Sequence, residues 1–272
     1  MALMTITTGI GSGGVTIAKR VADGLDLELY DDLKLQNEAV KMGISSEDLA
    51  SLDEKAPGLL DRLFGQKPQT YLDLMEAIIY KVASHGEGII LGHGAPFLLR
   101  DFDCALHVRI YASEIFRIQN LMEEQGLGQK TAERIIQKKD SERNGFLQFA
   151  FNMDLDDPSL YDVTINRSQL GMDWAVELII KAAQSEELKA CSLDALGAME
   201  KLSLSKKVEA AILKNNISIS DVHIEVPERG VVRVAGFLSP MVSEARLIEI
   251  IKAVPGVSDV KSDISPLPGV DI

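Results

Sequence analysis

The sequence predicts a three-layer α/β domain with a five-stranded parallel sheet, followed by a small α+β domain. Over residues 1–185, short apolar runs alternate with long amphipathic stretches, which is typical of parallel strands joined by crossover helices. After residue 204 the pattern changes to a helix, two alternating strands, a helix and a strand. A length of 272 residues also suits two unequal domains better than one.

The elements of the first domain follow from its apolar runs and its helix end signals. Ser113 is a plausible N-cap for one helix, and Gly126 marks the end of that helix. Further helical stretches extend to about Gly86 and about Asn152. The expected strands are residues 3–9, 27–31, 88–94, 105–112 and 160–168, and the other expected helices are residues 16–25 and 172–184.

The second domain is predicted from a different pattern. Arg229-Gly230 joins two alternating runs and indicates a hairpin. The expected helices are residues 205–216 and 240–256, and the expected strands are residues 221–228, 231–239 and 257–265. We therefore expect a first domain over residues 1–185, a partly helical linker over 186–204 and a small domain over 205–266.

Composition narrows the possible function classes. The chain carries 28 Lys plus Arg against 41 Asp plus Glu, a formal net charge of −13. This balance argues against a general DNA- or RNA-binding surface, because such a surface needs clustered cations. A small phosphorylated ligand needs only local positive charge and stays compatible with the composition. No run of about 18 apolar residues is present, so we expect no transmembrane segment.

The two cysteines, Cys104 and Cys191, are too few for a disulfide framework and lie in apolar segments. We expect free thiols that pack as small hydrophobic groups. No positively charged region precedes an apolar core near the N-terminus, so no signal peptide is expected. These features together favour a reducing cytoplasm. The lone tryptophan, Trp174, is expected to pack from the last helix of the first domain.

The most informative stretch is the glycine-rich loop after the first expected strand, "TTGIGSGGVTIAKRVA" over residues 7–22. Glycines let backbone N–H groups approach a phosphate, which also meets the positive N-terminus of the following helix. Alignment with the GxxxxGK[ST] phosphate loop places Gly14 at the lysine position and Thr8 at the first glycine. The alternative interpretation is a glycine-rich turn that binds no ligand. The candidate phosphate-binding residues are Gly11, Ser12, Gly13, Gly14 and Thr16.

Several stretches resemble the cytidylate kinase-like family of P-loop nucleoside monophosphate kinase relatives. The stretch "GSGGVTIAKRVADGLDLELYDD" resembles the start of that family. "IILGHGAPFLLRDFDCALHVRIYASEIFRIQNLMEEQGL" resembles its strand, short helix, strand and Arg-bearing helix, and the stretch from "AERIIQKKDSERNG" to "MDWAVELI" resembles its lid and last strand–helix unit. The resemblance covers about residues 3–184. Residues 205–265 resemble a BON domain in element order and in three glycines, Gly230, Gly236 and Gly256.

The family resemblance implies a P-loop kinase-like fold that holds ATP over the glycine loop, with Mg²⁺ bridging phosphates and a nucleotide-like acceptor nearby. The chain departs from the family pattern in three places. The Walker lysine is absent at Gly14, the Arg that often follows "GSGG" is Val15, and His93 stands where the family often has Arg. Rapid phosphoryl transfer would therefore need a cation from elsewhere in the chain or from a partner.

Two candidate groups lie near the expected acceptor. Asp31 and Asp32 end the second expected strand, where they could orient an acceptor or a metal-bound water, or cap the following helix. His93 could hydrogen-bond a substrate, or it could be a satisfied histidine in a tight Gly-His-Gly turn. We take Asp31 and His93 as candidate substrate-binding residues. The sequence indicates no protein-borne metal site.

Three further candidates are assigned catalytic roles through the resemblance. Arg117 lies one turn into a helix, where it is either a phosphate-binding residue or a solvated cation. Asp140 and Arg143 are spaced to pair on one helix face, and the family lid carries Asp and Arg that close over phosphates.

Two functions remain open. The first is a cytidylate kinase-like phosphotransferase that moves the ATP γ-phosphoryl group to a nucleoside monophosphate or similar small acceptor. The second is a kinase-derived protein without catalysis that senses a nucleotide, regulates, or acts as a scaffold through its BON-like module. That module is a candidate for binding a protein partner or for homo-oligomerisation.

Overall fold

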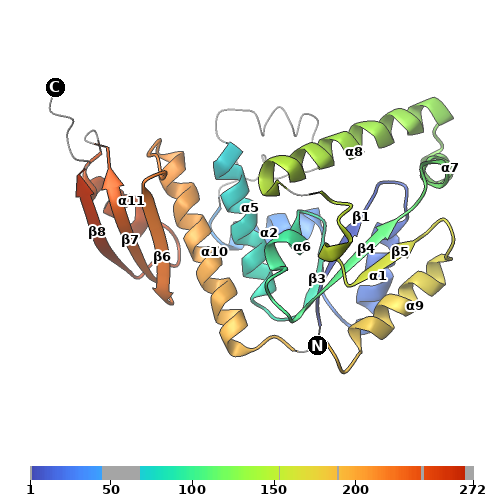
Figure 1. The fold of residues 1–272 in the computed structure, drawn as a ribbon, viewed down its shortest axis with the longest axis horizontal. Helices are drawn as coiled ribbons and strands as arrows, with labels where there is room; N and C mark the ends of the chain where they lie inside the picture. The colour runs from blue at the N-terminus through green and yellow to red at the C-terminus, as the bar shows by residue number, and fades with distance from the viewer. Residues whose placement is uncertain (1, 45–67, 153, 189, 240–241, 267–272) are drawn as a thin grey trace. The chain divides into compact units, whose positions relative to one another are not determined.

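The computed structural model describes residues 2–44, 68–152, 154–188, 190–239 and 242–266. The described residues form two compact units. The first unit contains residues 2–35 and 85–193, and the second contains residues 36–44, 68–84 and 194–266. Figure 1 shows the elements of both units.

The first unit is built on a five-stranded parallel sheet with strand order β2-β3-β1-β4-β5 (Figure 1). The strands are β1 (Leu3–Thr8), β2 (Leu29–Tyr30), β3 (Gly88–Leu91), β4 (Ala105–Tyr111) and β5 (Val163–Asn166). The helices are α1 (Gly14–Leu25), α6 (Ala95–Leu99), α7 (Glu114–Gln125), α8 (Gln129–Phe151) and α9 (Met172–Ala183), with the 3₁₀ turn η1 (Pro158–Leu160). Helix α2 (Asp32–Lys41) begins in this unit and continues in the second. The predicted five-stranded parallel α/β fold is confirmed.

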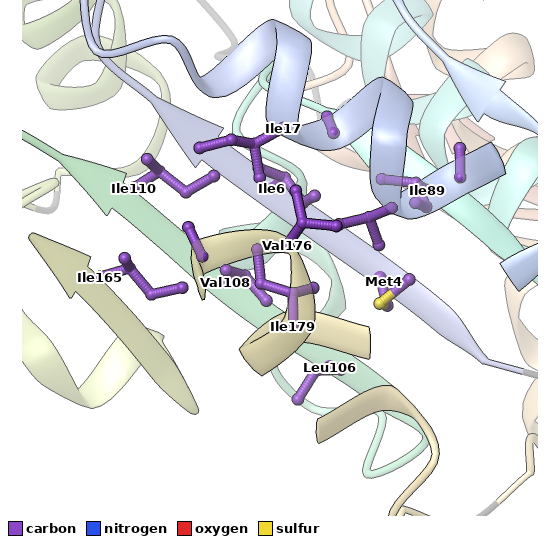
Figure 2. Close-up of a cluster of buried hydrophobic side chains, with 14 of the residues drawn as sticks. Met4, Ile6, Ile17, Ile89, Leu106, Val108, Ile110, Ile165, Val176 and Ile179 are labelled. Atoms are coloured by element: carbon purple, nitrogen blue, oxygen red, sulfur yellow. The ribbon is translucent and has the colours of Figure 1, made fainter. Parts of the chain in front are cut away.

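The main core lies between the sheet and the helices α1 and α9 (Figure 2). Side chains alternate along a strand, so Met4 and Ile6 of β1 enter this core, whereas Thr5 and Thr7 face the other side of the sheet. Helix α1 contributes Ile17 to the same core. Polar groups on the other face hydrogen-bond each other, as Thr5 Oγ1 and His107 Nδ1 do at 2.8 Å. This second face therefore carries buried polar groups beside the apolar side chains of Leu3 and Ile90.

Strand β1 lies at the centre of the sheet, where it pairs in parallel with both β3 and β4. Ile6 lies opposite Leu91, and Thr8 lies opposite Ile110. The carboxyl ends of these three strands therefore meet at one edge. Ligands of open parallel sheets bind at this edge, and the glycine loop begins there.

The second unit carries the predicted order of helix, two strands, helix and strand. Its elements are α5 (Pro68–Ala83), α10 (Leu193–Lys214), β6 (Val222–Glu228), β7 (Val231–Leu238), α11 (Glu244–Lys252) and β8 (Asp259–Pro266). Strand β7 is central, antiparallel to β6 and parallel to β8. Gly230 in the β6–β7 turn has a φ of 77°, which a glycine adopts without strain. The element order is confirmed, and the BON-like nature of this region stays a prediction.

Helix α10 extends further toward the N-terminus than expected. It begins at Leu193, so much of the expected linker over residues 186–204 is helical. This added length contacts α5 through a hydrogen bond from Ser203 Oγ to the Ala77 carbonyl at 2.7 Å. The second compact unit therefore includes residues 68–84, which the sequence-based boundaries place in the first domain.

Two expectations about single side chains are wrong. Cys104 and Cys191 form a disulfide instead of remaining free thiols, because the fold brings their Cα atoms to 4.9 Å across 87 residues of sequence. Trp174 does not pack, since it is 61% exposed. Helix α9 buries Ala175, Val176 and Ile179, so position 174 falls on the outer side of the helix.

None of the described helices combines the length and the apolar character that a membrane span requires.

Candidate functional site: the glycine loop and an arginine-lined cavity

The loop between β1 and α1 is closed by short hydrogen bonds among its own residues. The Ser12 backbone N–H donates to the Gly9 carbonyl at 3.1 Å, and Ser12 Oγ donates to the same carbonyl at 2.7 Å. Thr8 Oγ1 and Ser12 Oγ lie 2.6 Å apart. Ser12 is fully buried. Its hydroxyl therefore holds the loop together, because it is already engaged with loop atoms.

The N-terminus of α1 is open at the end of this loop. Gly13 is the N-cap residue and has a φ of 74°, and no side chain caps the helix. The first turn contains no acidic residue. The N–H groups of a first helical turn have no partner within the helix, and together with the helix dipole they attract anions. This end of α1 is therefore suited to a phosphate group.

The two departures from the P-loop pattern contact each other. A Cβ atom built on Gly14 would overlap the Oγ1 and Cβ atoms of Thr8. Thr8 thus occupies the space that a side chain at position 14 would need. The two departures from the motif are therefore coupled. The Thr8 side chain fills the space at position 14, so position 14 is a glycine.

Helix α7 braces the loop from the side. Arg117 Nε donates to the Ile10 carbonyl at 2.8 Å, and Asn120 Nδ2 donates to the Gly11 carbonyl at 3.1 Å. The Arg117 side chain is largely buried and lies against Gly9. Arg117 is therefore not a solvated helix cation, which was one of its two expected roles.

The Asp140 carboxylate pairs with Arg117. Its two oxygens accept from Arg117 Nη1 and Nη2, both at 2.8 Å. The expected pair between Asp140 and Arg143 on one face of α8 is wrong, because α7 places Arg117 within bidentate reach of Asp140. Arg143 forms no ion pair with any described residue. Arg117 consequently links three segments: the loop, α7 and α8.

A cavity of about 280 Å³ opens beside the loop and the carboxyl end of β4. Its charged lining consists of three arginines and two aspartates: Arg109, Arg117, Arg143, Asp140 and Asp156. The cations outnumber the carboxylates there, although the whole chain has a net charge of −13. The cavity can therefore attract a phosphorylated molecule.

Arg109, Asp156 and Asn144 line this cavity but were not identified from the sequence. Arg109 donates to the Leu155 carbonyl at 3.1 Å and pairs with Asp156. Its Cζ lies 5.7 Å from the ring centroid of Tyr111 and 5.7 Å from that of Tyr161. The available signal was a lone arginine within an apolar strand. Position 109 lies opposite Thr7, so alternation places it on the same face of the sheet as Thr5 and Thr7.

The ring of Tyr161 lies beside Arg109. Burial raises the pKa of its hydroxyl, and its hydrogen bond with Thr7 and the charge of Arg109 act in the opposite direction. Tyr161 therefore stays protonated at neutral pH. Its hydroxyl donates to the Leu155 carbonyl at 3.1 Å and so fixes the segment that holds Arg109.

Asp31 and His93 do not line the arginine-lined cavity. Asp31 Oδ1 accepts from the Lys34 backbone N–H at 3.0 Å, so Asp31 caps the first turn of α2. His93 is buried between two glycines in a turn where its own φ is 55°. Its Nε2 lies 2.9 Å from Asp32 Oδ1. Asp31 thus caps a helix and His93 is hydrogen-bonded in its turn, which were the alternatives to a substrate-binding role. A role of either residue in binding an acceptor stays a prediction.

Three of the candidate loop residues lie where they could contact a phosphate or its metal ion. Gly13 and Gly14 lie at the open helix end, and Thr16 is exposed in the first turn of α1. Among the residues that the structure describes, no group of three or more His, Cys, Asp or Glu side chains could hold a metal ion. A divalent cation at this site would need phosphate oxygens as further ligands.

The match to known proteins covers the part of the chain that builds this site. Residues 3–169 match the Cytidylate kinase-like family. The chain belongs to this family. Among its relatives, the cytidylate kinase of Desulfurococcus amylolyticus is 27% identical over 174 residues, which are 62% of this chain and 85% of that enzyme. The cytidylate kinase of Archaeoglobus fulgidus is 25% identical over 188 residues, which are 68% of this chain and 97% of that enzyme.

The fold of this cytidylate kinase-like chain also occurs in a solved structure. The crystal structure of an uncharacterized protein from Eubacterium ventriosum is similar with a TM-score of 0.52 and 23% identity. The similarity covers 68% of this chain and 100% of that protein. It shows the shared fold only. The chain thus combines a P-loop kinase-like fold with a loop that lacks the lysine.

Proposed function

We propose that the chain is a phosphotransferase that moves the γ-phosphoryl group of ATP to a nucleoside monophosphate or a similar small acceptor. The arginine-lined cavity carries this proposal, because it places three guanidinium groups beside Thr8 and Gly9, where the glycine loop begins, in a member of the cytidylate kinase-like family. The relatives named above are cytidylate kinases, so cytidine monophosphate is the first acceptor to test.

In this reaction an acceptor oxygen forms a new bond to the γ-phosphorus while the bond to the bridging oxygen of ATP breaks. Charge on the transferred group is stabilised by fixed cations. The backbone N–H groups at the start of α1 would hold phosphate oxygens, and Arg117 would keep the loop in place through Ile10. Arg143 has no carboxylate partner among the described residues, so its guanidinium is the one best able to contact the transferred group.

Magnesium bound with the nucleotide would supply further positive charge between the phosphates. The Thr16 hydroxyl is exposed in the first turn of α1 and corresponds to the P-loop Ser/Thr that faces Mg²⁺. The loop residues therefore suit ATP with Mg²⁺, whereas no carboxylate cluster among the described residues would bind the metal alone.

An assay of ADP formation with ATP, Mg²⁺ and a panel of nucleoside monophosphates tests the proposal. We expect turnover with at least one acceptor and a loss of roughly 10²–10³-fold in kcat for Arg143→Gln, the usual effect of removing one preorganised donor. Lys138→Gln is the matched control, because Lys138 lies on the same helix, is largely exposed and pairs with Glu142 at 3.8 Å. Absence of turnover with every acceptor would refute the phosphotransferase. Equal rates for Arg143→Gln and the wild type would refute the role given to Arg143.

The alternative is a nucleotide-sensing or scaffold protein without catalysis. Two observations favour it: Thr8 closes position 14 to a lysine, and Arg109 and Arg117 are each engaged by a carboxylate. Calorimetry together with the ADP assay separates these functions: a nucleotide sensor binds ATP without forming ADP, and a scaffold forms no ADP whether or not it binds ATP.

A further inference from the structure

Arg167 lies beside the glycine loop, although it comes from a distant part of the chain. It follows β5 directly, and its backbone N–H donates to the Tyr111 carbonyl at 2.8 Å. Its side chain reaches the N-cap of α1: Nη2 and Nε lie 3.9 and 4.0 Å from the point where a Cβ on Gly13 would stand. Arg167 is only 9% exposed.

Among the residues that the structure describes, the guanidinium of Arg167 has no anionic partner. Nη1 donates to the Leu170 carbonyl, and Cζ lies 5.4 Å from the ring centroid of Phe116. The Nε–H is buried and has no hydrogen-bond partner in the described part of the chain. No described carboxylate pairs with it, whereas Arg109 and Arg117 each have one.

A buried cation without a partner is costly, because it has lost water and gained no compensating charge. Burial lowers the pKa of Arg167 accordingly, although an arginine stays protonated at any physiological pH. The open N-terminus of α1 adds a second positive feature at the same place. Two unsatisfied positive groups that face one point are complementary to an anion.

We propose that Arg167 is a phosphate-binding residue that supplies the cation missing from position 14 of the glycine loop. Its ligand is the phosphate chain of a nucleoside triphosphate, bound between the Arg167 guanidinium and the first turn of α1. This inference rests on the proposed function, since it assumes that the loop binds a nucleotide. It also answers how a loop without lysine can hold a polyphosphate: the charge comes from the β5–α9 connection.

Calorimetry with ATP, tripolyphosphate and adenosine on the full chain tests this role. We expect Arg167→Gln to weaken binding of ATP and tripolyphosphate roughly 10- to 150-fold, the range for hydrogen bonds to charged groups, and to leave adenosine binding unchanged. Arg167→Lys should recover part of the loss. Arg20→Gln is the control, because Arg20 lies on α1, pairs with Asp173 at 2.8 Å and is 43% exposed.

The outcomes separate this inference from the proposed function. A wild-type chain that binds neither ATP nor tripolyphosphate would refute both. If Arg167→Gln binds ATP as tightly as a wild type that does bind it, only the role of Arg167 is refuted. An equal loss in Arg20→Gln would also refute it, because the effect would then reflect general charge.

A measurement on the unmodified protein covers the case in which the Arg167 variants do not fold. Phenylglyoxal modifies arginines, and peptide mass spectrometry gives the rate at each site. Saturating tripolyphosphate should slow modification of Arg167 and leave that of Arg20 unchanged. An Arg167 rate that does not respond to tripolyphosphate, in a protein that binds it by calorimetry, would overturn the inference.

Discussion

At the scale of single residues, Thr8 and Gly14 explain how the glycine loop can lack its lysine and keep its shape. The Thr8 side chain fills the space above Gly14 and hydrogen-bonds Ser12 inside the loop. A lysine placed at position 14 alone would meet Thr8 before it reached any phosphate. Restoring the P-loop pattern therefore requires both positions to change together.

We expect Gly14→Lys alone to lower the melting temperature without tightening ATP binding, because its Cβ overlaps Thr8. The double variant Thr8→Gly, Gly14→Lys should fold and gain about 1.5–3 kcal/mol in ATP affinity, the range for a charge-assisted hydrogen bond. Thermal melts and calorimetry on both variants check this, with Thr8→Gly as the control for a loosened loop. A gain in affinity from Gly14→Lys at unchanged stability would contradict this account of the loop.

Residues that act through tertiary contacts could not be identified from the sequence. The glycines predict a phosphate loop because their spacing is a local signal. Arg117 and Asp140 were identified as candidates through the family resemblance. Their pairing with each other, rather than Asp140 with Arg143, depends on the distance between α7 and α8. Arg109 was missed because a lone arginine in an apolar run lines a cavity only when the sheet places it there. The position of Arg167 beside Gly13 likewise depends on tertiary packing and leaves no local signal.

At the scale of elements, the strands were largely predictable because apolar runs and alternation are local signals. Ser113 caps α7 and Gly126 ends it, as expected. Helix α11 begins only at Glu244, where Ser243 is the cap, so it is shorter than the expected 240–256. Residue 240, where this helix is expected to start, lies outside the described residues. The disulfide between Cys104 and Cys191 gave no local signal, because its partners are 87 residues apart.

Helices α5 and α10 meet through a buried charge cluster. Lys206 Nζ lies 3.6 Å from Asp73, 3.2 Å from Glu76 and 2.9 Å from Glu209. Burial raises the pKa of Asp73 to about 7, although Lys206 and Gln69 act in the opposite direction. Burial also raises the pKa of Glu76. Asp73 is fully buried, and its Oδ2 has no hydrogen-bond partner among the described residues.

This cluster predicts a pH-dependent stability. The folded pKa of Asp73 lies above the unfolded value of 3.8, so the folded state retains a proton that the unfolded state releases. The free energy of unfolding should therefore fall as pH rises from about 4 to about 7 and stay lowered above that. Asp73→Asn removes this titration and should stabilise the chain at pH 8 by about 1–3 kcal/mol.

Denaturant unfolding of the wild type and Asp73→Asn at several pH values between 4 and 8 measures the effect. Glu225→Gln is the matched control, since Glu225 is an exposed acid of the same unit. A variant whose stability falls with pH as steeply as that of the wild type would contradict the role of Asp73.

At the scale of the whole molecule, the chain order of elements does not coincide with its compact units. The sequence pattern predicts the boundary between residues 185 and 205, where the pattern of strands and helices changes. The second compact unit nevertheless includes residues 68–84, because α5 packs with α10 through Ser203, Lys206 and their partners. Such a pairing between distant helices leaves no periodicity in the sequence, so it could not be predicted.

Cleavage of the connection between α9 and α10 distinguishes the two descriptions. Glu186 and Glu187 are exposed there and lie outside both helices, so a glutamate-specific protease should cut at them. If residues 1–185 were a self-contained domain, the two fragments would separate under native conditions. The contacts between α5 and α10 lie within the second unit but on different fragments. We therefore expect the fragments to co-elute in size-exclusion chromatography, even after reduction of the Cys104–Cys191 bond.

Denaturant should separate the two fragments, which serves as the control for complete cleavage. Elution of two independent folded fragments without denaturant would restore the boundary read from the sequence and would show that the α5–α10 contacts contribute little to holding the chain together.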